Sequence, residues 1–407
     1  MLKRLKSVIY QVSDIEKAEK WYLKILGKGP AVSNPFKVVF DIGGVELMLV
    51  PKKPEGERGE SGCTASWLVD DLDITYKDFI NFGATPVTEI RSAFNTHWAT
   101  FRDPFGNLFT ITGEIDASRR TVEVKPSETA MGVTYLRALS AAEEREEIKG
   151  GDFLSRIFLN DDKGMNDPKI RRYILENHIN YGVYEFITAR TAFMDEETKR
   201  AFNENVPQMV FLGAGYDSRP YRFKDIAGRT KIFELDISPT QERKIAILKK
   251  NNIAIPDGLK YVPINFNREK IGDALMSAGY DPKLKTFFIW EGVIYYLSMD
   301  AINATFSFIK SNSAPGSSIC FDYCHPHEEV RDEYGVAKMV KSWETHKNEP
   351  IIFALGRGKI EGFLGERGFK LTRHLNSEDM GKTYLTLKNG ELSGRVPALY
   401  CFAKAEN

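Results

Sequence analysis

Apolar and polar positions repeat within the first 115 residues, at an offset of roughly 57 residues. In residues 8–27, and again in residues 66–84, a short apolar strand pattern leads into a segment with apolar residues at helical spacing. Residues 41–50 and 103–112 then carry the pattern of hairpin strands. The sequence therefore predicts two copies of one unit, in which a strand is followed by a helix and by hairpin strands.

Local signals agree with this repeat. Asp14 and Asp71 stand where helix N-caps belong, and Gly27 and Gly83 stand where the helices should end. With its DPFGN turn, the segment from residue 4 to residue 114 resembles the glyoxalase, bleomycin-resistance and extradiol-dioxygenase superfamily, also called vicinal oxygen chelate. The resemblance implies an α+β domain made of paired βαβββ modules.

Enzymes of that superfamily bind a divalent metal through His and Glu residues of the paired modules, because a hard cation needs several converging N and O ligands. The matching positions in this chain are Ser7, Thr64 and Thr110. None of these side chains is a convincing ligand, so we expect no metal in this domain.

Aromatic residues on the predicted strands suggest a different use of the first domain. A curved sheet lined by them would hold an aromatic or otherwise apolar ligand. Aromatic residues on strands also serve as ordinary packing, and a structural or dimer-forming role stays equally open. The candidates for a lining are Trp67, Phe94, His97, Trp98 and Phe101.

The alternating pattern is lost in residues 114–128, which carry mixed charge and contain Pro126, as a linker between two cores does. Beyond it, residues 127–159 show apolar positions at spacings of three and four, which predicts helix. We therefore expect one domain at 1–117 and a second at 126–407.

A nucleotide-site pattern occurs in the second domain. The apolar strand QMVFL leads directly into a loop with Gly213 and Gly215, and the next apolar strand ends in Asp236. In an open α/β sheet such glycines let the backbone approach a ligand, and the acid can accept both ribose hydroxyls. A dinucleotide fingerprint would need a third small residue where this chain has Ser218, and Arg219 is the only obvious partner for pyrophosphate.

Two charged residues favour S-adenosylmethionine over NAD. Glu291 interrupts an apolar run, where a carboxylate needs a cationic partner, and this cofactor offers an ammonium and a sulfonium. Arg190, on a helical stretch upstream, could supply bidentate hydrogen bonds to the cofactor carboxylate. After a third strand, Asn265 and Phe266 are residue types able to recognise the edge of an adenine and cover its face.

The motifs SETAMGVTYLRA, ITARTAFMD, FLGAGYDSRPYRF, FELDISPTQERK and FIWEGVIYYLS together resemble the leucine carboxyl methyltransferase family, over about residues 126–404. The resemblance implies a class I methyltransferase fold, which is a Rossmann-like α/β sheet with helices on both faces. It also implies S-adenosylmethionine contacts from Arg190, Gly213, Gly215, Asp236 and Glu291, with Arg137 of the YLRA segment as an addition. Many relatives have Asp where this chain has Asn265, which weakens that assignment.

Methyl transfer needs the nucleophile, methyl and sulfur in line, and a general base is optional. A carboxylate acceptor is nucleophilic as it stands, whereas a hydroxyl would profit from a base. The segment SSICFDYCHPHEE offers Asp322, Tyr323, His325 and His327, of which we name Tyr323 and His325 as candidates. The cluster of Cys324, His325 and His327 lacks a fourth zinc ligand at suitable spacing. Tyr334 and Trp343 lie in a helical excursion that could form an acceptor pocket or lid.

Composition removes several classes of function. The 56 basic and 56 acidic side chains cancel, and Lys and Arg form no long run, which argues against nucleic acid as a partner. Four scattered cysteines fit a reducing cytosol. We find no signal peptide and no apolar stretch of membrane-spanning length, so a cytoplasmic location is expected.

The leading hypothesis is an S-adenosylmethionine-dependent methyltransferase that methylates a carboxylate or hydroxyl oxygen of a small molecule or peptide. The first domain would be an accessory module that helps to bind the acceptor or pairs two subunits. The alternative is a protein that sequesters a ligand and whose methyltransferase domain is inactive.

Overall fold

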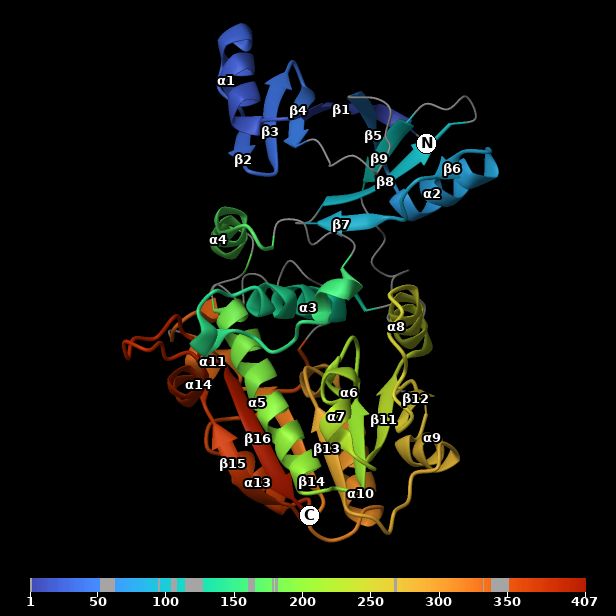
Figure 1. The fold of residues 1–407 in the computed structure, drawn as a ribbon, viewed down its shortest axis with the longest axis vertical. Helices are drawn as coiled ribbons and strands as arrows, with labels where there is room; N and C mark the ends of the chain where they lie inside the picture. The colour runs from blue at the N-terminus through green and yellow to red at the C-terminus, as the bar shows by residue number, and fades with distance from the viewer. Residues whose placement is uncertain are drawn as a thin grey trace. The chain divides into compact units, whose positions relative to one another are not determined.

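The structure, a computed structural model, divides into two compact units, Met1–Arg119 and Arg120–Asn407 (Figure 1). It describes residues 2–51, 63–93, 96–103, 108–113, 127–159, 165–177, 179, 182–266, 269–331, 333–337 and 351–407. Among these residues no helix is both long and apolar enough to cross a membrane.

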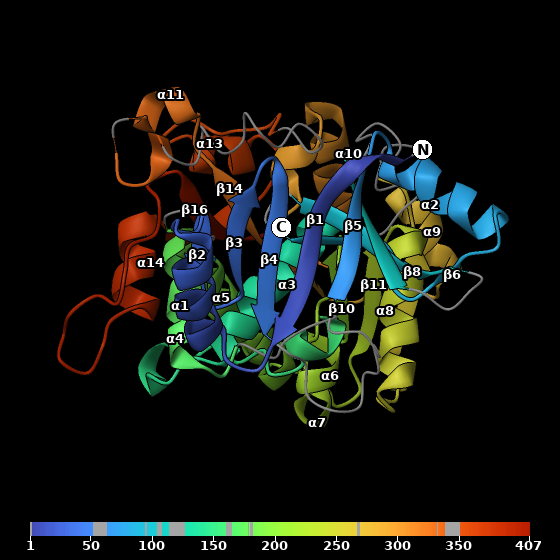
Figure 2. The same cartoon turned by 90° about the horizontal axis from the view of Figure 1, so that it is seen from above.

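The first unit contains the predicted repeat. The first copy comprises β1 (Leu2–Val12), α1 (Ile15–Leu26), β2 (Val32–Asn34), β3 (Lys37–Ile42) and β4 (Val45–Pro51). The second comprises β5 (Cys63–Val69), α2 (Leu72–Asn81), β6 (Thr85–Pro86), β7 (Arg91–Ala93), β8 (Thr96–Arg102) and β9 (Leu108–Gly113). The strands form one sheet in the order β2-β3-β4-β1-β5-β9-β8-β6, with β7 beside β8. Figure 2 shows β3, β4, β1 and β5 side by side, and the antiparallel β1 and β5 join the two copies.

The predicted helix ends of the repeat are confirmed. The Asp14 carboxylate accepts a hydrogen bond from the backbone N–H of Lys17 at 3.0 Å, and Asp71 accepts from Ile74 at 2.8 Å. These bonds satisfy N–H groups that have no partner within the helix. Gly27 ends α1 with φ at +64°, a conformation that glycine adopts without steric cost.

Each copy has its own small core between its helix and its part of the sheet. In the first copy Val38, Phe40 and Leu49 are buried under α1. In the second copy Phe101 is fully buried and packs with Leu72 of α2, and Trp67 packs against the same cluster. Phe101 is therefore a core residue, which is the packing alternative that the sequence left open for it.

The second unit is built on a seven-stranded sheet in the order β12-β11-β10-β13-β14-β16-β15. Its strands are β10 (Gln208–Leu212), β11 (Lys231–Asp236), β12 (Leu259–Pro263), β13 (Thr286–Trp290), β14 (Ser318–Cys324), β15 (Lys370–Leu375) and β16 (Tyr400–Glu406). Strands β10 to β14 run parallel, and β16 pairs antiparallel with β14 and β15.

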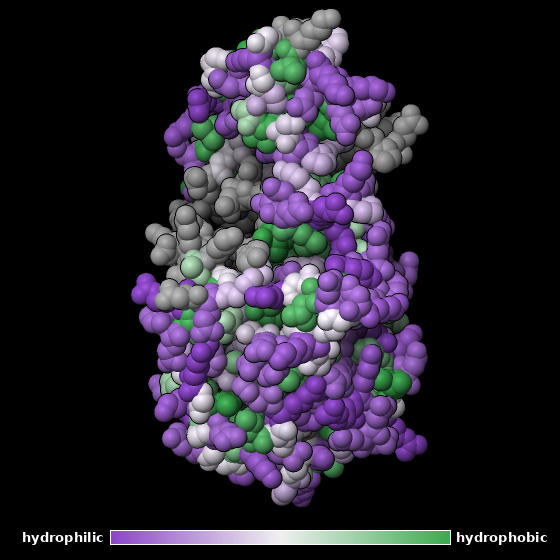
Figure 3. Space-filling view, turned by 90° about the vertical axis from the view of Figure 1, so that its left-hand side faces the viewer, coloured by the Kyte–Doolittle hydropathy of each residue, from purple (hydrophilic) through white to green (hydrophobic). Residues whose placement is uncertain are grey.

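Helices lie on both faces of this sheet, which confirms the predicted fold class (Figure 1). They are α3 (Glu128–Ala141), α4 (Pro168–Asn177), α5 (Val183–Asn203), α6 (Arg219–Arg222), α7 (Lys224–Ala227), α8 (Ser238–Lys250), α9 (Ile271–Ser277), α10 (Met299–Ser311), α11 (His327–Val330), α13 (Ile360–Gly365) and α14 (Ser377–Tyr384). Every residue of β10, β13 and β14 is buried, as the continuous apolar runs of a parallel sheet require. On the outer face shown in Figure 3, hydrophobic residues form only scattered patches among hydrophilic ones.

The helix expected over residues 127–159 is shorter than predicted. It ends at Ala141, and two short 3-10 turns, Glu146–Ile148 and Ser155–Phe158, follow. The Glu143 carboxylate accepts from the backbone N–H of Glu144 at 2.9 Å, so a side chain takes the N–H that a continuing helix would bond to a carbonyl.

Candidate functional site

The carboxyl ends of β10, β11, β13 and β14 lie along one edge of the second sheet. Strand β10 has β11 on one side and β13 on the other, so the chain connections diverge on either side of it. Such a switch point is where open α/β sheets bind ligands. Four of the predicted cofactor residues, Gly213, Gly215, Asp236 and Glu291, lie at the ends of these strands.

The loop after β10 is held against the end of β11 by hydrogen bonds. The N–H of Gly213 donates to the carbonyl of Leu235 at 2.8 Å, and the N–H of Gly215 donates to Oδ2 of Asp236 at 2.5 Å. Oδ1 of Asp236 accepts from the N–H of Ile237 at 2.7 Å. Burial raises the pKa of the Asp236 carboxyl, and these two N–H donors oppose the rise. The glycine loop and the strand-end acid therefore form one unit.

Close packing explains why glycine stands at position 213. Its φ is +72°, and a Cβ there would lie 2.5 Å from Cγ2 of Val293, in the loop after β13. At Gly215, with φ at +52°, a Cβ would lie 3.4 Å from Ala130 of α3. The loop thus lies between the segment after β13 and α3, with little room for a side chain at 213.

Glu291, directly after β13, joins two buried arginines. Its Oε1 lies 3.1 Å from Nε of Arg190 on α5, and its Oε2 lies 2.7 Å from Nη1 of Arg219 on α6. Burial by itself would raise the pKa of the Glu291 carboxyl, but the charges of Arg219, Arg190 and Arg137 lower it to about 2. The Glu291 carboxylate is therefore ionised at neutral pH.

The network continues from Arg219 into α5. Arg219 is 1% exposed in its side chain and pairs with Asp195 at 2.7 Å and with Asp217 at 2.5 Å, in addition to Glu291. Arg222 also bonds Asp195, at 2.7 Å. Three carboxylates already neutralise the charge of Arg219, so it is a poor partner for a pyrophosphate, which disfavours NAD further.

Arg137 of α3 supports the glycine loop from its other side. Its Nη2 donates to the carbonyl of Tyr216 at 3.0 Å, and its Nε lies 3.3 Å from Asp152. Arg137 is buried, so these contacts are shielded from water. In this structure it contacts the loop rather than an open cavity.

The third strand brings Asn265 and Phe266 near Asp236. The N–H of Ile264 donates to the Asp236 carbonyl at 2.9 Å, and the N–H of Asn265 donates to the Glu269 carboxylate at 2.8 Å. Asn265 and Phe266 are half-buried. Asn265 and Phe266 therefore come directly after Ile264, which is hydrogen-bonded to the backbone of Asp236.

Side chains of β14 point alternately to opposite faces of the sheet, and only some reach this site. Asp322 bonds Arg190, whereas Tyr323 makes a 3.0 Å hydrogen bond with His374 of β15. His325 is buried, with Nδ1 2.8 Å from the Leu355 carbonyl. The structure thus gives Tyr323 and His325 partners other than Arg190 and Glu291, and their role as bases stays a prediction.

The side chains of the Cys324, His325 and His327 cluster, for which no zinc was expected, have separate partners. The Cys324 thiol donates to the carbonyl of Phe353 at 3.6 Å, and His327 lies 3.3 Å from Glu328. No group of three or more His, Cys, Asp or Glu able to hold a metal occurs in the part of the chain that the structure describes. Tyr334 lies near the guanidinium of Arg395, and Trp343 lies outside the described residues.

In the first unit, Ser7 and Thr110 are buried and Thr64 is half-buried. Ser7 stands opposite Ser66, which stands beside Thr110, so hydroxyl groups cross three neighbouring strands. His97 and Trp98 are half-buried, and Phe94 lies outside the described residues.

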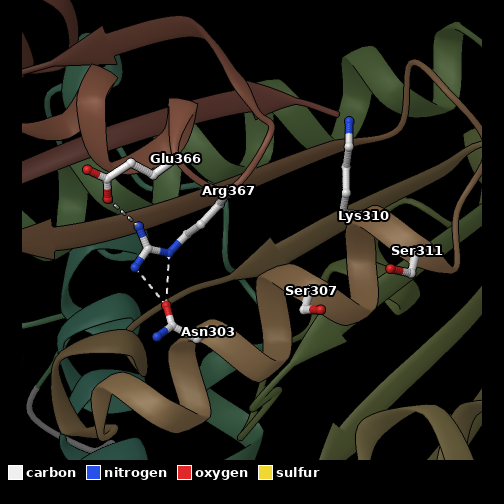
Figure 4. A pocket seen from close by; sticks show the side chains of 6 residues that line it. All are labelled: Asn303, Ser307, Lys310, Ser311, Glu366 and Arg367. Atoms are coloured by element: carbon white, nitrogen blue, oxygen red, sulfur yellow. Dashed lines mark hydrogen bonds and ion pairs between the residues drawn. The ribbon is translucent and has the colours of Figure 1, made fainter.

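A surface pocket of about 440 Å³ lies away from this edge, beside α10 (Figure 4). Within it, Arg367 donates to Asn303 at 2.6 Å, and Lys310 donates to the carbonyl of Gly368 at 3.0 Å. None of the predicted site residues lines it. The lining residues are Asn303, Ser307, Lys310, Ser311, Glu366 and Arg367.

Sequence reasoning missed several groups of this site. Arg219 was considered only as a partner for pyrophosphate, and the residues not singled out are Tyr295, Asp152, Asp195, Asp217 and Arg222. Arginine and acids within otherwise apolar segments were the available signal, because a buried charge requires a partner.

Comparison with known proteins agrees with both domains. Residues 130–310 match the model of the family described as Leucine carboxyl methyltransferase, and residues 4–111 match that of the Glyoxalase/Bleomycin resistance protein/Dioxygenase superfamily. The predicted fusion of these two domains is thereby confirmed.

Individual relatives and solved structures are also similar to this chain. The protein YktD of Bacillus subtilis (strain 168), named as an S-adenosyl-L-methionine-dependent methyltransferase, is 29% identical over 232 residues, which span 56% of this chain and 74% of the relative. A protein of Mycolicibacterium paratuberculosis with the same description is 27% identical over 297 residues, or 68% of this chain and 93% of the relative. A solved DUF574 family protein from Streptomyces avermitilis is 13% identical with a TM-score of 0.46, covering 71% of this chain and 100% of that one.

Proposed function

We infer that this chain, which joins a leucine carboxyl methyltransferase domain to a glyoxalase-type domain, is an S-adenosylmethionine-dependent methyltransferase. We propose further that it methylates an oxygen, of a carboxylate or hydroxyl, on a small molecule or peptide. The observation that carries the proposal is the hydrogen bond between Gly215 and Asp236, which unites glycine loop and acid at the edge where Glu291 also lies.

The residues present suit this cofactor. Each Asp236 oxygen accepts one backbone N–H, and a carboxylate oxygen has two acceptor sites, so both oxygens retain capacity for the ribose hydroxyls. Each Glu291 oxygen likewise has one arginine partner and so retains an acceptor site for the ammonium group of the cofactor. These acids supply the negative charge that a cationic cofactor needs.

Arg190 fits the cofactor carboxylate in a narrower way than the sequence suggested. Its Nε lies beside Glu291, and its Nη1 donates to Asp322 and Tyr295. Among the described residues neither Nε, which is buried, nor Nη2 makes a hydrogen bond, and Nη2 is the part of the guanidinium that we assign to the cofactor carboxylate. A bidentate clamp through Nε and Nη2 would require the cofactor carboxylate to displace Glu291 from its ion pair with Nε.

When bound, the cofactor supplies a methyl group activated by its sulfonium. The chain's own part is to hold it: Asp236 orients the ribose, Glu291 and Arg190 orient the amino-acid end, and Gly213 lets the backbone approach. Holding these groups fixes the direction from which an acceptor oxygen must attack. A carboxylate acceptor would need no proton removed, which suits a site in which the side chains of Tyr323 and His325 are engaged with His374 and the Leu355 carbonyl.

Calorimetric titration of the full chain with S-adenosylhomocysteine, S-adenosylmethionine and NAD tests the cofactor. We expect binding of both adenosyl compounds and none of NAD, and failure to bind either adenosyl compound would refute the proposal. Transfer of a labelled methyl group to a panel of carboxylic acids and phenols then tests the acceptor class. Cofactor binding without transfer to any acceptor would favour the alternative, a sequestering protein with an inactive second domain.

A further inference from the structure

Asp322, near the end of β14, is the residue on which three parts of the site converge. It is 0% exposed. Oδ2 accepts from Nη1 of Arg190 at 2.9 Å and from the hydroxyl of Tyr295 at 2.9 Å. Oδ1 accepts from the backbone N–H of Gly292 at 2.7 Å. The donors come from α5, from the turn Ile294–Tyr296 and from the loop that carries Glu291.

These bonds argue against a role for Asp322 as a base. Its two oxygens already accept three hydrogen bonds, one of them from an arginine, which leaves little acceptor capacity for a substrate hydroxyl. Asp322 also has no exposed surface through which an acceptor hydroxyl could reach it. Its hydrogen bonds instead suit a role in holding Arg190, Tyr295 and Gly292 in place.

Asp322 sets the orientation of the guanidinium that we assign to the cofactor. Nη1 of Arg190 donates to Asp322, and Nε lies 3.1 Å from Glu291 in an ion pair without a hydrogen bond, so these two contacts orient the plane of the guanidinium. Gly292 has a φ of +72°, and a Cβ there would lie 3.1 Å from Nη1 of Arg190. The same carboxylate therefore holds Arg190 and the adjoining backbone in contact.

We propose that Asp322 is a positioning residue for the amino-acid end of S-adenosylmethionine, acting through Arg190 and Gly292 without touching the ligand. The proposal rests on the proposed function. It separates two parts of one cofactor site: Asp236 serves the nucleoside, and Asp322 serves the carboxylate end through Arg190.

The test compares two ligands on the Asp322→Asn variant of the full chain. S-adenosylhomocysteine carries the amino-acid end, and 5′-methylthioadenosine lacks it. The asparagine keeps an oxygen for the Gly292 N–H but replaces the charged partner of Arg190. We expect the dissociation constant for S-adenosylhomocysteine to rise about tenfold or more, as loss of a charge-assisted hydrogen bond implies. That for 5′-methylthioadenosine should change less than about twofold.

The Glu197→Gln variant is the matched control. Glu197 is also a fully buried acid, on the same helix as Arg190, and it pairs with Arg373 at 2.6 Å and Lys404 at 2.7 Å. Its substitution should lower stability without altering the ratio of the two dissociation constants. A merely structural role for Asp322 would make both variants behave alike.

If Asp322→Asn does not fold, the Tyr295→Phe variant provides a second test of the positioning role. It removes only the hydroxyl shared by Asp322 and Arg190, and should shift the ratio in the same direction by a smaller factor. An unchanged ratio in the folded variants overturns the positioning role. Failure of the wild-type chain to bind S-adenosylhomocysteine would instead remove the proposed function itself.

Discussion

Replacing Asp236 by Asn tests the assignment of the ribose site. In the wild type, its two oxygens accept the N–H groups of Gly215 and Ile237 at 2.5 and 2.7 Å. Asparagine keeps one acceptor oxygen and puts an NH₂ group where the other stood. One backbone N–H then faces a donor, and the ribose loses one acceptor.

The expected loss follows from that count. Hydrogen bonds to a charged group contribute about 1.5–3 kcal/mol, so the loss of one to the ribose should weaken S-adenosylhomocysteine binding by roughly 10- to 150-fold. The unpaired N–H at the glycine loop should separately lower the free energy of unfolding by about 1–3 kcal/mol. Burial raises the pKa of Asp236, which partly offsets this second loss, because the carboxylate itself is disfavoured there.

Calorimetry with S-adenosylhomocysteine and its 2′-deoxy analogue separates the two effects. The wild type should discriminate against the deoxy compound, and Asp236→Asn should lose most of that discrimination. Asp257→Asn, an exposed acid just before β12, is a control that removes a carboxylate far from the carboxyl edge. If Asp236→Asn binds S-adenosylhomocysteine within about twofold of the wild type, this carboxylate does not hold the ribose.

Three further outcomes are expected. The pKa of Glu291 is lowered from 4.5 to about 2, so its contribution to stability, about 3 kcal/mol, is present above pH 4.5 and lost as the pH falls toward 2. The free energy of unfolding of Glu291→Gln should therefore fall less steeply with pH over this range than that of the wild type. An unchanged pH dependence would contradict the pairing. Gly213→Ala should lower the free energy of unfolding by about 1–3 kcal/mol, because its Cβ would lie 2.5 Å from Val293 at φ +72°; adding Val293→Ala should recover part of the loss in a chemical denaturation series. EDTA should leave the Tm unchanged, because Ser7 and Thr110 occupy the positions at which enzymes of the superfamily carry their metal ligands. A fall in Tm would reveal a metal that we did not predict.

The local parts of the fold could be predicted from the sequence alone. A helix cap needs only an acid and the N–H three residues on, so Asp14 and Asp71 were recognisable from spacing. The turn at Gly213 follows its strand directly, and Asp236 ends the next one, so their common edge follows from the parallel order of the sheet. Short-range hydrogen bonding and strand polarity determine these features.

Contacts between distant segments were decided only by the tertiary structure. Arg190 and Asp322 stand 132 positions apart, and nothing in either local sequence says that they pair. Strand register decided that Asp322 faces Arg190 while its neighbour Tyr323 faces His374, because adjacent side chains on a strand point to opposite faces. A charged residue within an apolar segment indicates from the sequence that it needs a partner, but tertiary packing determines which residue that partner is.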